Sequence, residues 1–479
     1  MKKDIILSGV GGQGILSIAT VIGKAALDAG LSIKQAEVHG MSQRGGDVQS
    51  NLRIASGEIA SDLIARGVAD IIISLEPLEA LRYLPWLSKE GWVITNTAPL
   101  INIPNYPEAE ALRQGVASQY PSMSGIPELK EQASRFIRAF LDIGVAPQGC
   151  IPTVGSMQGS FTLFLLCSQL DPKKNKILFI DPGFPVQRNQ VHILNIPHAS
   201  FDIYEYRAEK LGPKLESYLT QGDVAAIVYS NPNNPAWICL TEEELRTVGE
   251  LASRYDAIVI EDLAYLCMDF RKPLGRPFEA PYQSSVARYT QNYILMISGS
   301  KIFSYAGQRI AVAAISDTLY TRQYPALRER YGMARLGDAY VLTILYAASS
   351  GTSHSAQYAL AAMFRAAADG RLDFVAETSE YARRARLTKE LFLRHGFRIV
   401  YDKDQDEAVS DGFFYTVGYG DLTSSELLSE LLLYGICAIS LTTTGSRQPG
   451  IRVCVSQLNR PEQFDLLEAR LTAFGQNHR

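Results

Sequence analysis

In the first hundred or so residues, hydrophobic and polar positions alternate between strand-like and helix-like spacing. Five short strand-like runs recur there, DIILS, SIKQAEV, VQSNLRI, ADIIISL and GWVITN, and stretches with helical spacing at Ile15–Asp28 and Pro77–Trp86 lie among them. Alternation of strand and helix signals predicts an α/β unit with a largely parallel sheet. The segment Ile101–Glu110, INIPNYPEAE, holds two prolines and then opens a new helical pattern, so it is the best candidate for a domain boundary.

A second series of strands and helices follows this boundary. The runs KILFID, AAIVYS, AIVIED and YILMIS are almost continuously apolar, which predicts strands covered on both faces. A helix-rich stretch runs from Leu319 to about Ala368, and the last hundred residues read as a smaller α+β lobe. We therefore expect three domains, at 1–107, 108–368 and 369–479.

Composition narrows the class of function. The chain has 479 residues, of which 47% are hydrophobic and 20% charged, and its net charge is −4. This is a globular composition, and it gives no electrostatic reason to expect nucleic acid. No stretch approaches the roughly 20 apolar residues that span a bilayer, and the N-terminal apolar run is too short for a signal peptide. We expect a cytoplasmic protein that acts on a small metabolite and contacts no membrane.

Cysteines and histidines offer no metal site. The six histidines are dispersed, and the six cysteines form no Cys-x-x-Cys pair. The pattern predicts reduced thiols, mostly in the core, and no bound metal. The cysteines are Cys150, Cys167, Cys239, Cys267, Cys437 and Cys454.

Polar residues follow three of the buried strands directly. SNPNNPAW comes after AAIVY, EDLAY after AIVI, and SGSKIFSYAGQR after YILMI. Ligands of parallel α/β sheets bind beyond the carboxyl ends of the strands, so we expect Asn234, Asp262, Tyr265, Lys301 and Arg309 to face one crevice. Each residue alone has an ordinary explanation as a solvated side chain, a cap or a turn. The combination is what indicates chemistry.

Together these residues match the needs of pyridoxal 5'-phosphate. A partly desolvated Lys301 can bond an aldehyde, and Asp262 can keep a pyridine nitrogen protonated so that the ring accepts electrons. Asn234 and Tyr265 can hydrogen-bond a ring oxygen. Arg309 supplies a guanidinium fork for a phosphate.

Further groups for the phosphate come from two other segments. Ser298 and Ser300 lie beside the lysine, and TVGSMQGSF places Gly155, Ser156 and Met157 at the start of a predicted helix. The unpaired N–H groups of a helix N-terminus favour an anion.

The motifs SNPNNPAW, EDLAY, SGSKIFSYAGQR and GIRVCVSQL, in this order, resemble those of the fold-type I aminotransferases of class I/II. The resemblance runs from about Glu108 to the C-terminus. It implies a large domain with a mostly parallel seven-stranded sheet between helices and a small C-terminal α+β domain. It also implies that Lys301 binds the cofactor covalently and carries the proton, and that Asp262 pairs with the ring nitrogen.

The same resemblance implies roles for three other residues, and the chain departs from the family pattern at one place. Phe184 in DPGFP would stack on the cofactor ring, and Arg452 would bind the substrate carboxylate. Tyr120 would reach the phosphate of a neighbouring subunit, so a homodimer is implied. The family usually has Thr-Gly where this chain has Ala236 and Trp237; Trp237 either reshapes the substrate pocket or packs outward.

The glycine loop GVGGQG lies near the N-terminus, outside the aminotransferase-like part of the chain. It fits G-x-G-x-x-G at Gly9, Gly11 and Gly14, with Glu37 as a candidate ribose ligand, but a lone match is weak and a tight turn needs the same glycines. With EVHGMSQRGGDVQS and ISLEPLEALRYLP, the loop resembles the gamma-type domain of 2-oxoacid:ferredoxin oxidoreductases, such as the small (beta) subunit of indolepyruvate ferredoxin oxidoreductase. The loop either makes only the turn, the reading we favour, or meets a phosphate or coenzyme A.

Both resemblances look incomplete where they join near Pro107. The gamma-type, Rossmann-like domain is expected to be truncated, and the aminotransferase part lacks its usual N-terminal arm. We predict an aminotransferase that exchanges an amino group between an L-amino acid, with an aromatic one as the leading candidate, and a 2-oxo acid. The alternatives are a subunit or scaffold of an oxidoreductase complex, with an oxidoreductase alpha subunit as partner, and an impaired fusion protein that only binds pyridoxal phosphate.

Overall fold

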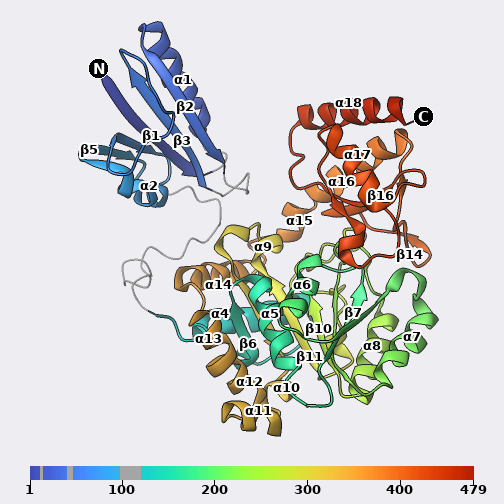
Figure 1. The fold of residues 1–479 in the computed structure, drawn as a ribbon. Coiled ribbons are helices and arrows are strands. Elements are labelled where there is room, and N and C mark those ends of the chain that lie inside the picture. The colour runs from blue at the N-terminus through green and yellow to red at the C-terminus, as the bar shows by residue number, and fades with distance from the viewer. Residues whose placement is uncertain (11–13, 40–46, 98–119, 479) are drawn as a thin grey trace. The chain divides into compact units, whose positions relative to one another are not determined.

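The computed structural model describes residues 1–10, 14–39, 47–97 and 120–478, and the side chains of Leu16, 37–39 and Asp47 lie outside the description. The chain forms two compact units, Met1–Pro104 and Asn105–Arg479 (Figure 1). We call them the N-terminal unit and the C-terminal unit. Among the described residues, no helix is both long and apolar enough to cross a membrane.

The N-terminal unit is a five-stranded sheet in the order β2-β3-β1-β4-β5. Apolar side chains of β1 point alternately to two cores: Ile5 and Leu7 pack with α1, and Ile6 packs with Tyr83 of α2. The elements are β1 (Lys2–Val10), α1 (Ile15–Asp28), β2 (Ser32–His39), β3 (Asp47–Ala55), β4 (Ala69–Ser74), α2 (Pro77–Tyr83), a 3-10 turn (Leu84–Trp86) and β5 (Leu87–Thr95).

The expectation that the sheet of this unit is largely parallel is wrong. β3 is antiparallel to both β1 and β2, whereas β4 is parallel to β1 and to β5. The link from His39 to Asp47 is too short for a crossover, which needs about a dozen residues, so β3 must run back along β2. Strand signals give the elements, but the length of the connection decides their direction.

The C-terminal unit has a large lobe around a seven-stranded sheet, in the order β6-β12-β11-β10-β9-β7-β8. Only β12 is antiparallel to its neighbours, and the predicted mostly parallel sheet between helices is confirmed (Figure 1). The strands are β6 (Cys150–Thr153), β7 (Lys176–Asp181), β8 (His198–Asp202), β9 (Val224–Ser230), β10 (Ile258–Asp262), β11 (Tyr293–Ser298) and β12 (Ala311–Ile315).

Helices cover this sheet, and all five residues of β10 are buried, as continuous apolarity predicts. Side chains of α5, α6 and the segment after β12 share one core with a face of the strands. The helices are α4 (Pro127–Leu141), α5 (Gly155–Cys167), α6 (Pro185–Ile193), α7 (Leu211–Leu219), α8 (Glu242–Arg254), α9 (Gly299–Ile302), α10 (Asp317–Thr321), α11 (Pro325–Tyr331), α12 (Leu336–Ala339), a π-helix (Tyr340–Leu345), α13 (Tyr346–Ser349) and α14 (His354–Ala368). Short 3-10 turns lie at Pro147–Gly149, Ile203–Glu205, Ala208–Lys210, Val286–Arg288 and Ala306–Gln308.

The small lobe, from α15 to α18, is built on an antiparallel four-stranded sheet in the order β13-β16-β18-β17. Helices α16, α17 and α18 pack on it through residues such as Phe392, Leu427 and Phe474. Its elements are α15 (Phe374–Thr378), α16 (Glu380–Arg394), β13 (Arg398–Ile399), β14 (Lys403–Asp404), β15 (Glu407–Ala408), β16 (Phe414–Gly418), α17 (Ser424–Leu433), β17 (Ile439–Ser440), a 3-10 turn (Leu441–Thr444), β18 (Ile451–Cys454) and α18 (Pro461–Asn477).

Candidate active site

The predicted site residues follow three neighbouring strands. β10 pairs in parallel with β9 on one side and with β11 on the other, so the segments after these strands begin at the same edge of the sheet. Asp262 is the last residue of β10, and Lys301 lies in α9, directly after β11. Burial lowers the pKa of Lys301, which increases the fraction of neutral amine.

Asp262 is a buried carboxylate at this edge. Its Oδ1 accepts the N–H of Ala264 at 3.1 Å, and only 6% of the residue is exposed. Burial raises the pKa of Asp262 to about 6, because desolvation outweighs that hydrogen bond. A cationic ring nitrogen placed against this carboxylate would oppose the effect of burial.

Asn234 joins two of the other predicted residues. Its Nδ2 donates to Tyr265 Oη at 3.4 Å, and its Oδ1 accepts from Arg452 Nη1 at 2.9 Å. Burial raises the pKa of Tyr265, so the phenol keeps its proton and can donate it. Arg452 comes from β18 of the small lobe, and its guanidinium carbon lies 4.2 Å from the ring centroid of Phe414. The site is therefore shared by both lobes.

The start of α5 lies beside a cationic side chain, Arg309, and we call this arrangement the Gly155–Arg309 cradle. Gly155 has a left-handed φ of 66°, which favours glycine, and a Cβ there would lie 2.7 Å from Arg309 Nη2, so a larger residue would displace the guanidinium. Ser156 Oγ is buried and has no hydrogen-bond partner among the described residues. A buried hydroxyl beside a guanidinium and a helix N-terminus fits a phosphate group.

The other predicted residues of the cofactor site differ in their surroundings. Ser298 caps α9, because its Oγ accepts the Ser300 N–H at 3.2 Å. The Met157 carbonyl accepts a hydrogen bond from Gln190 Nε2 at 2.8 Å. Phe184, directly before α6, is half-buried. Tyr120 is 91% exposed.

Trp237 does not pack outward. Its side chain is fully buried, with ring centroids 5.1 Å from Tyr265 and 6.1 Å from Phe414. The residue has a left-handed φ of 64°, which is uncommon for a bulky side chain. Trp237 thus fills the junction between the two lobes beside Tyr265.

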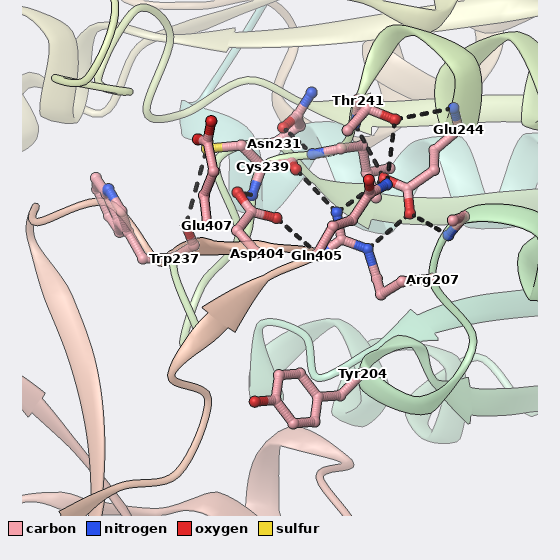
Figure 2. Close-up of polar contacts among 12 residues, drawn as sticks. Tyr204, Arg207, Asn231, Trp237, Cys239, Thr241, Glu244, Asp404, Gln405 and Glu407 are labelled. Atoms are coloured by element: carbon pink, nitrogen blue, oxygen red, sulfur yellow. Dashed lines mark hydrogen bonds and ion pairs between the residues drawn. The ribbon is translucent and has the colours of Figure 1, made fainter.

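Sequence reasoning missed several residues of this junction. Lys301 Nζ lies 5.0 Å from the ring centroid of Phe413, which in turn contacts Tyr381 at 3.9 Å between centroids. The string DGFFY could have drawn attention to Phe413, the first of three consecutive aromatic residues after Gly412. A buried ionic cluster around Arg207 and Asp404 was also missed (Figure 2). The expectation that cysteines are mostly buried holds for four of them, whereas Cys437 is exposed and Cys454 is half-buried.

In the N-terminal unit, the glycine loop is described only at its ends. Gly14 caps α1 with a left-handed φ of 84° and has open space around a built Cβ. This conformation fits the role of making a tight turn. Gly11 and the Glu37 side chain lie outside the described residues.

Comparisons with known proteins match two families to two parts of the chain, and the two matches overlap at residues 98–138. The family model "Aminotransferase class I and II" matches residues 98–469, and "Pyruvate ferredoxin/flavodoxin oxidoreductase" matches residues 4–138. The Thermus thermophilus aspartate aminotransferase with maleate superposes with a TM-score of 0.60 at 20% identity, over 77% of this chain and 86% of that chain. This likeness shows the fold.

Curated relatives fall into two groups. The indolepyruvate oxidoreductase subunit IorB of Archaeoglobus fulgidus is 48% identical over 101 residues, which are 21% of this chain and 49% of the relative. The protein of the same name from Thermococcus kodakarensis is 40% identical over 220 residues, 45% of this chain and 96% of the relative. The aspartate aminotransferase of Pyrococcus horikoshii is 22% identical over 193 residues, 40% of this chain and 47% of the relative. The chain thus spans about half the length of some of these relatives.

Proposed function

Because the chain belongs to the class I and II aminotransferase family, whose members are typically dependent on pyridoxal phosphate, we propose that its C-terminal unit binds that cofactor and transfers amino groups with it. The reaction exchanges an amino group between an L-amino acid and a 2-oxo acid. One observation carries the proposal: a buried hydroxyl, Ser156 Oγ, faces no partner in the described chain beside the Gly155–Arg309 cradle. A phosphate group satisfies both the hydroxyl and the guanidinium.

In this proposal each residue has a physical task. Arg309, with Ser156, Ser298, Ser300 and the start of α5, holds the phosphate. Asp262 pairs with the ring nitrogen. Asn234 and Tyr265 hydrogen-bond the ring oxygen, and Phe184 covers a face of the ring.

Lys301 is the covalent partner of the cofactor and the group that moves the proton. When bound, pyridoxal phosphate supplies a ring that accepts the electrons left at the substrate Cα. With the cofactor bound, the free Lys301 amine would accept the proton from the substrate Cα and would later donate a proton back to the reacting carbon atoms. Burial lowers the pKa of Lys301, so more of the amine is neutral and able to act as a base near neutral pH.

Arg452 recognises the substrate carboxylate. Its guanidinium is half-buried, its Nε has no hydrogen-bond partner among the described residues, and Nη1 already contacts Asn234. A planar fork with a buried unpaired N–H suits bidentate binding of a carboxylate. Trp237 borders the same junction and limits the space for the substrate.

The N-terminal unit favours a second role beside transamination. It is similar to proteins named indolepyruvate oxidoreductase subunit, and indolepyruvate is the 2-oxo acid that corresponds to tryptophan. We infer that this unit joins an oxidoreductase subunit, that transamination of an aromatic amino acid supplies the 2-oxo acid, and that the protein acts in the cytoplasm. Tyr120, exposed in the single chain, is available to a second copy, so the C-terminal unit forms a homodimer in this proposal.

The direct test is formation of a 2-oxo acid from an amino acid by the full chain loaded with pyridoxal phosphate. We expect product from the wild type and none from Lys301→Ala. Lys173→Ala, which changes an exposed lysine, is the matched control and should behave as wild type. Product from Lys301→Ala at the wild-type rate would overturn the assignment, and absence of product from the wild type would favour the scaffold or impaired-fusion alternative.

A further inference from the structure

A buried ionic cluster joins the β14–β15 hairpin of the small lobe to the large lobe (Figure 2). Arg207 donates to both carboxylate oxygens of Glu244, at 2.7 and 2.8 Å, and its Nη1 donates to Asp404 Oδ1 at 2.7 Å. On the other side of Asp404, Oδ2 accepts from Arg271 Nη2 at 2.8 Å and from the Cys239 N–H at 3.1 Å. Only 4% of the Asp404 side chain is exposed, so water screens these contacts little.

Within the cluster, each arginine already has a carboxylate from its own lobe. Arg207 pairs with Glu244, and Arg271 pairs with Asp269 through two contacts, at 2.7 and 3.0 Å. The small lobe adds two carboxylates: the buried Asp404, and the exposed Glu407, whose Oε2 lies 3.6 Å from Arg271 Nη1. Loss of the Asp404 charge therefore leaves both arginines paired, and the large lobe has no uncompensated buried cation.

The cluster touches the loop that carries a predicted cofactor ligand. Cys239 belongs to the segment 231–240, which is closed by a bond from the Asn233 N–H to the Ile238 carbonyl at 2.9 Å. The same segment presents Asn234 to Arg452. The small lobe thus hydrogen-bonds one short loop at two points, through Asp404 at one end and Arg452 in the middle, and Phe414 of the same lobe packs against Trp237 of that loop.

We propose that Asp404 is a positioning residue that fixes the small lobe against the loop 231–240 and so sets the placement of Arg452 beside Asn234. This inference rests on the proposed function, in which Arg452 binds the substrate carboxylate. Asp404 lies in the hairpin, outside the set that touches cofactor or substrate. Its contribution is to substrate affinity, because the carboxylate contact exists both before and during the reaction.

The test variant is Asp404→Asn, which keeps the shape and removes the charge. The amide NH₂ group of asparagine must face either Arg207 or the pair Arg271 and Cys239, which are all donors. At least one of these two sets of hydrogen bonds is therefore lost. We expect the KM for the amino acid to rise about tenfold, kcat to change less than about twofold, and the affinity for pyridoxal phosphate to stay constant. Amide hydrogen exchange of residues 238–240 should become faster in the protein prepared without cofactor.

Asp256→Asn is the matched control. It breaks another two-point contact with an arginine, Arg322, at 2.6 and 2.7 Å, but the Asp256 side chain is 47% exposed and lies on the helix–strand turn before β10. We expect wild-type KM and wild-type exchange at 238–240 for this variant. Asp404→Glu keeps the charge but displaces the carboxylate, so it should fold and still raise the KM, which covers the case in which Asp404→Asn does not fold.

Unchanged exchange at 238–240 in the Asp404 variants, or a KM equal to that of Asp256→Asn, overturns the inference. A fall in melting temperature with KM unchanged does the same, because it assigns Asp404 to stability alone. Absence of transamination by the wild type overturns the proposed function instead. The exchange measurement needs no cofactor and separates the two failures.

Discussion

Gly412 and Trp237 should be energetically coupled across the junction of the two lobes. A Cβ built at Gly412 lies 2.0 Å from Trp237 Cε2, 2.2 Å from Cζ2 and 2.3 Å from Nε1. Carbon atoms in contact are about 3.5–4.0 Å apart, so Gly412→Ala requires the indole to move by about 1.5 Å. Trp237 is fully buried between Tyr265 and Phe414 and has little space to move. Such overpacking costs about 1–3 kcal/mol of unfolding free energy.

Trp237→Gly changes the free energy of unfolding through two opposing effects. Loss of a buried tryptophan side chain costs about 3–5 kcal/mol, whereas glycine adopts the φ of 64° without strain and recovers about 1 kcal/mol. We expect a net loss of about 2–4 kcal/mol. In the double variant the added methyl group meets no indole, so its stability should equal that of Trp237→Gly alone.

The assay is urea unfolding of the four full-length proteins, followed by far-UV circular dichroism. The predicted coupling free energy between the two substitutions is about 1–3 kcal/mol, which equals the destabilisation expected from Gly412→Ala alone. Additive effects would refute the reasoning, because they would mean that the indole does not occupy the space beside Gly412.

Three further predictions concern charge. Arg309→Ala should weaken the binding of pyridoxal phosphate by about 10- to 100-fold while leaving that of phosphate-free pyridoxal unchanged, as measured by absorbance titration. Burial raises the pKa of Glu261 to about 7, above its value in an unfolded chain, so its contribution to stability is present below about pH 4.5 and is lost as the pH rises through about 7. In urea unfolding at pH 5 and pH 8, Glu261→Gln should therefore reduce the loss of stability at pH 8; an unchanged pH dependence would contradict this. Asp262→Asn should retain phosphate binding but slow the removal of the substrate Cα proton, seen as a larger effect on kcat than on cofactor affinity.

The sequence predicted the central strands well because their signal is local. β9, β10 and β11 are almost wholly apolar and end in polar motifs, so both their burial and their common edge follow from neighbouring residues. The direction of β3 was wrong because it depends on the length of the link before it.

Contacts between distant segments were beyond the reach of sequence patterns. Asp404 meets Arg207, 197 residues earlier in the chain, and no periodicity relates them. The orientation of Trp237 was open for the same reason: the space that receives its ring is set by Gly412 and Phe414 of the other lobe. Residues at one edge of a sheet can be inferred together from local patterns, whereas patterns do not reveal which residues meet between lobes; only the family resemblance placed Arg452 of the small lobe at the site.

The account depends most on cofactor binding by Lys301 and on its response to an amino acid. The decisive measurement is the visible absorption spectrum of the full chain with pyridoxal phosphate, before and after addition of L-tyrosine, L-tryptophan, L-phenylalanine, L-glutamate or L-aspartate. The account predicts a visible band for the bound cofactor that is absent in Lys301→Ala, and conversion of that band to the pyridoxamine form by at least one of these amino acids. A wild-type protein without the band, or a Lys301→Ala protein that keeps it, would contradict the account.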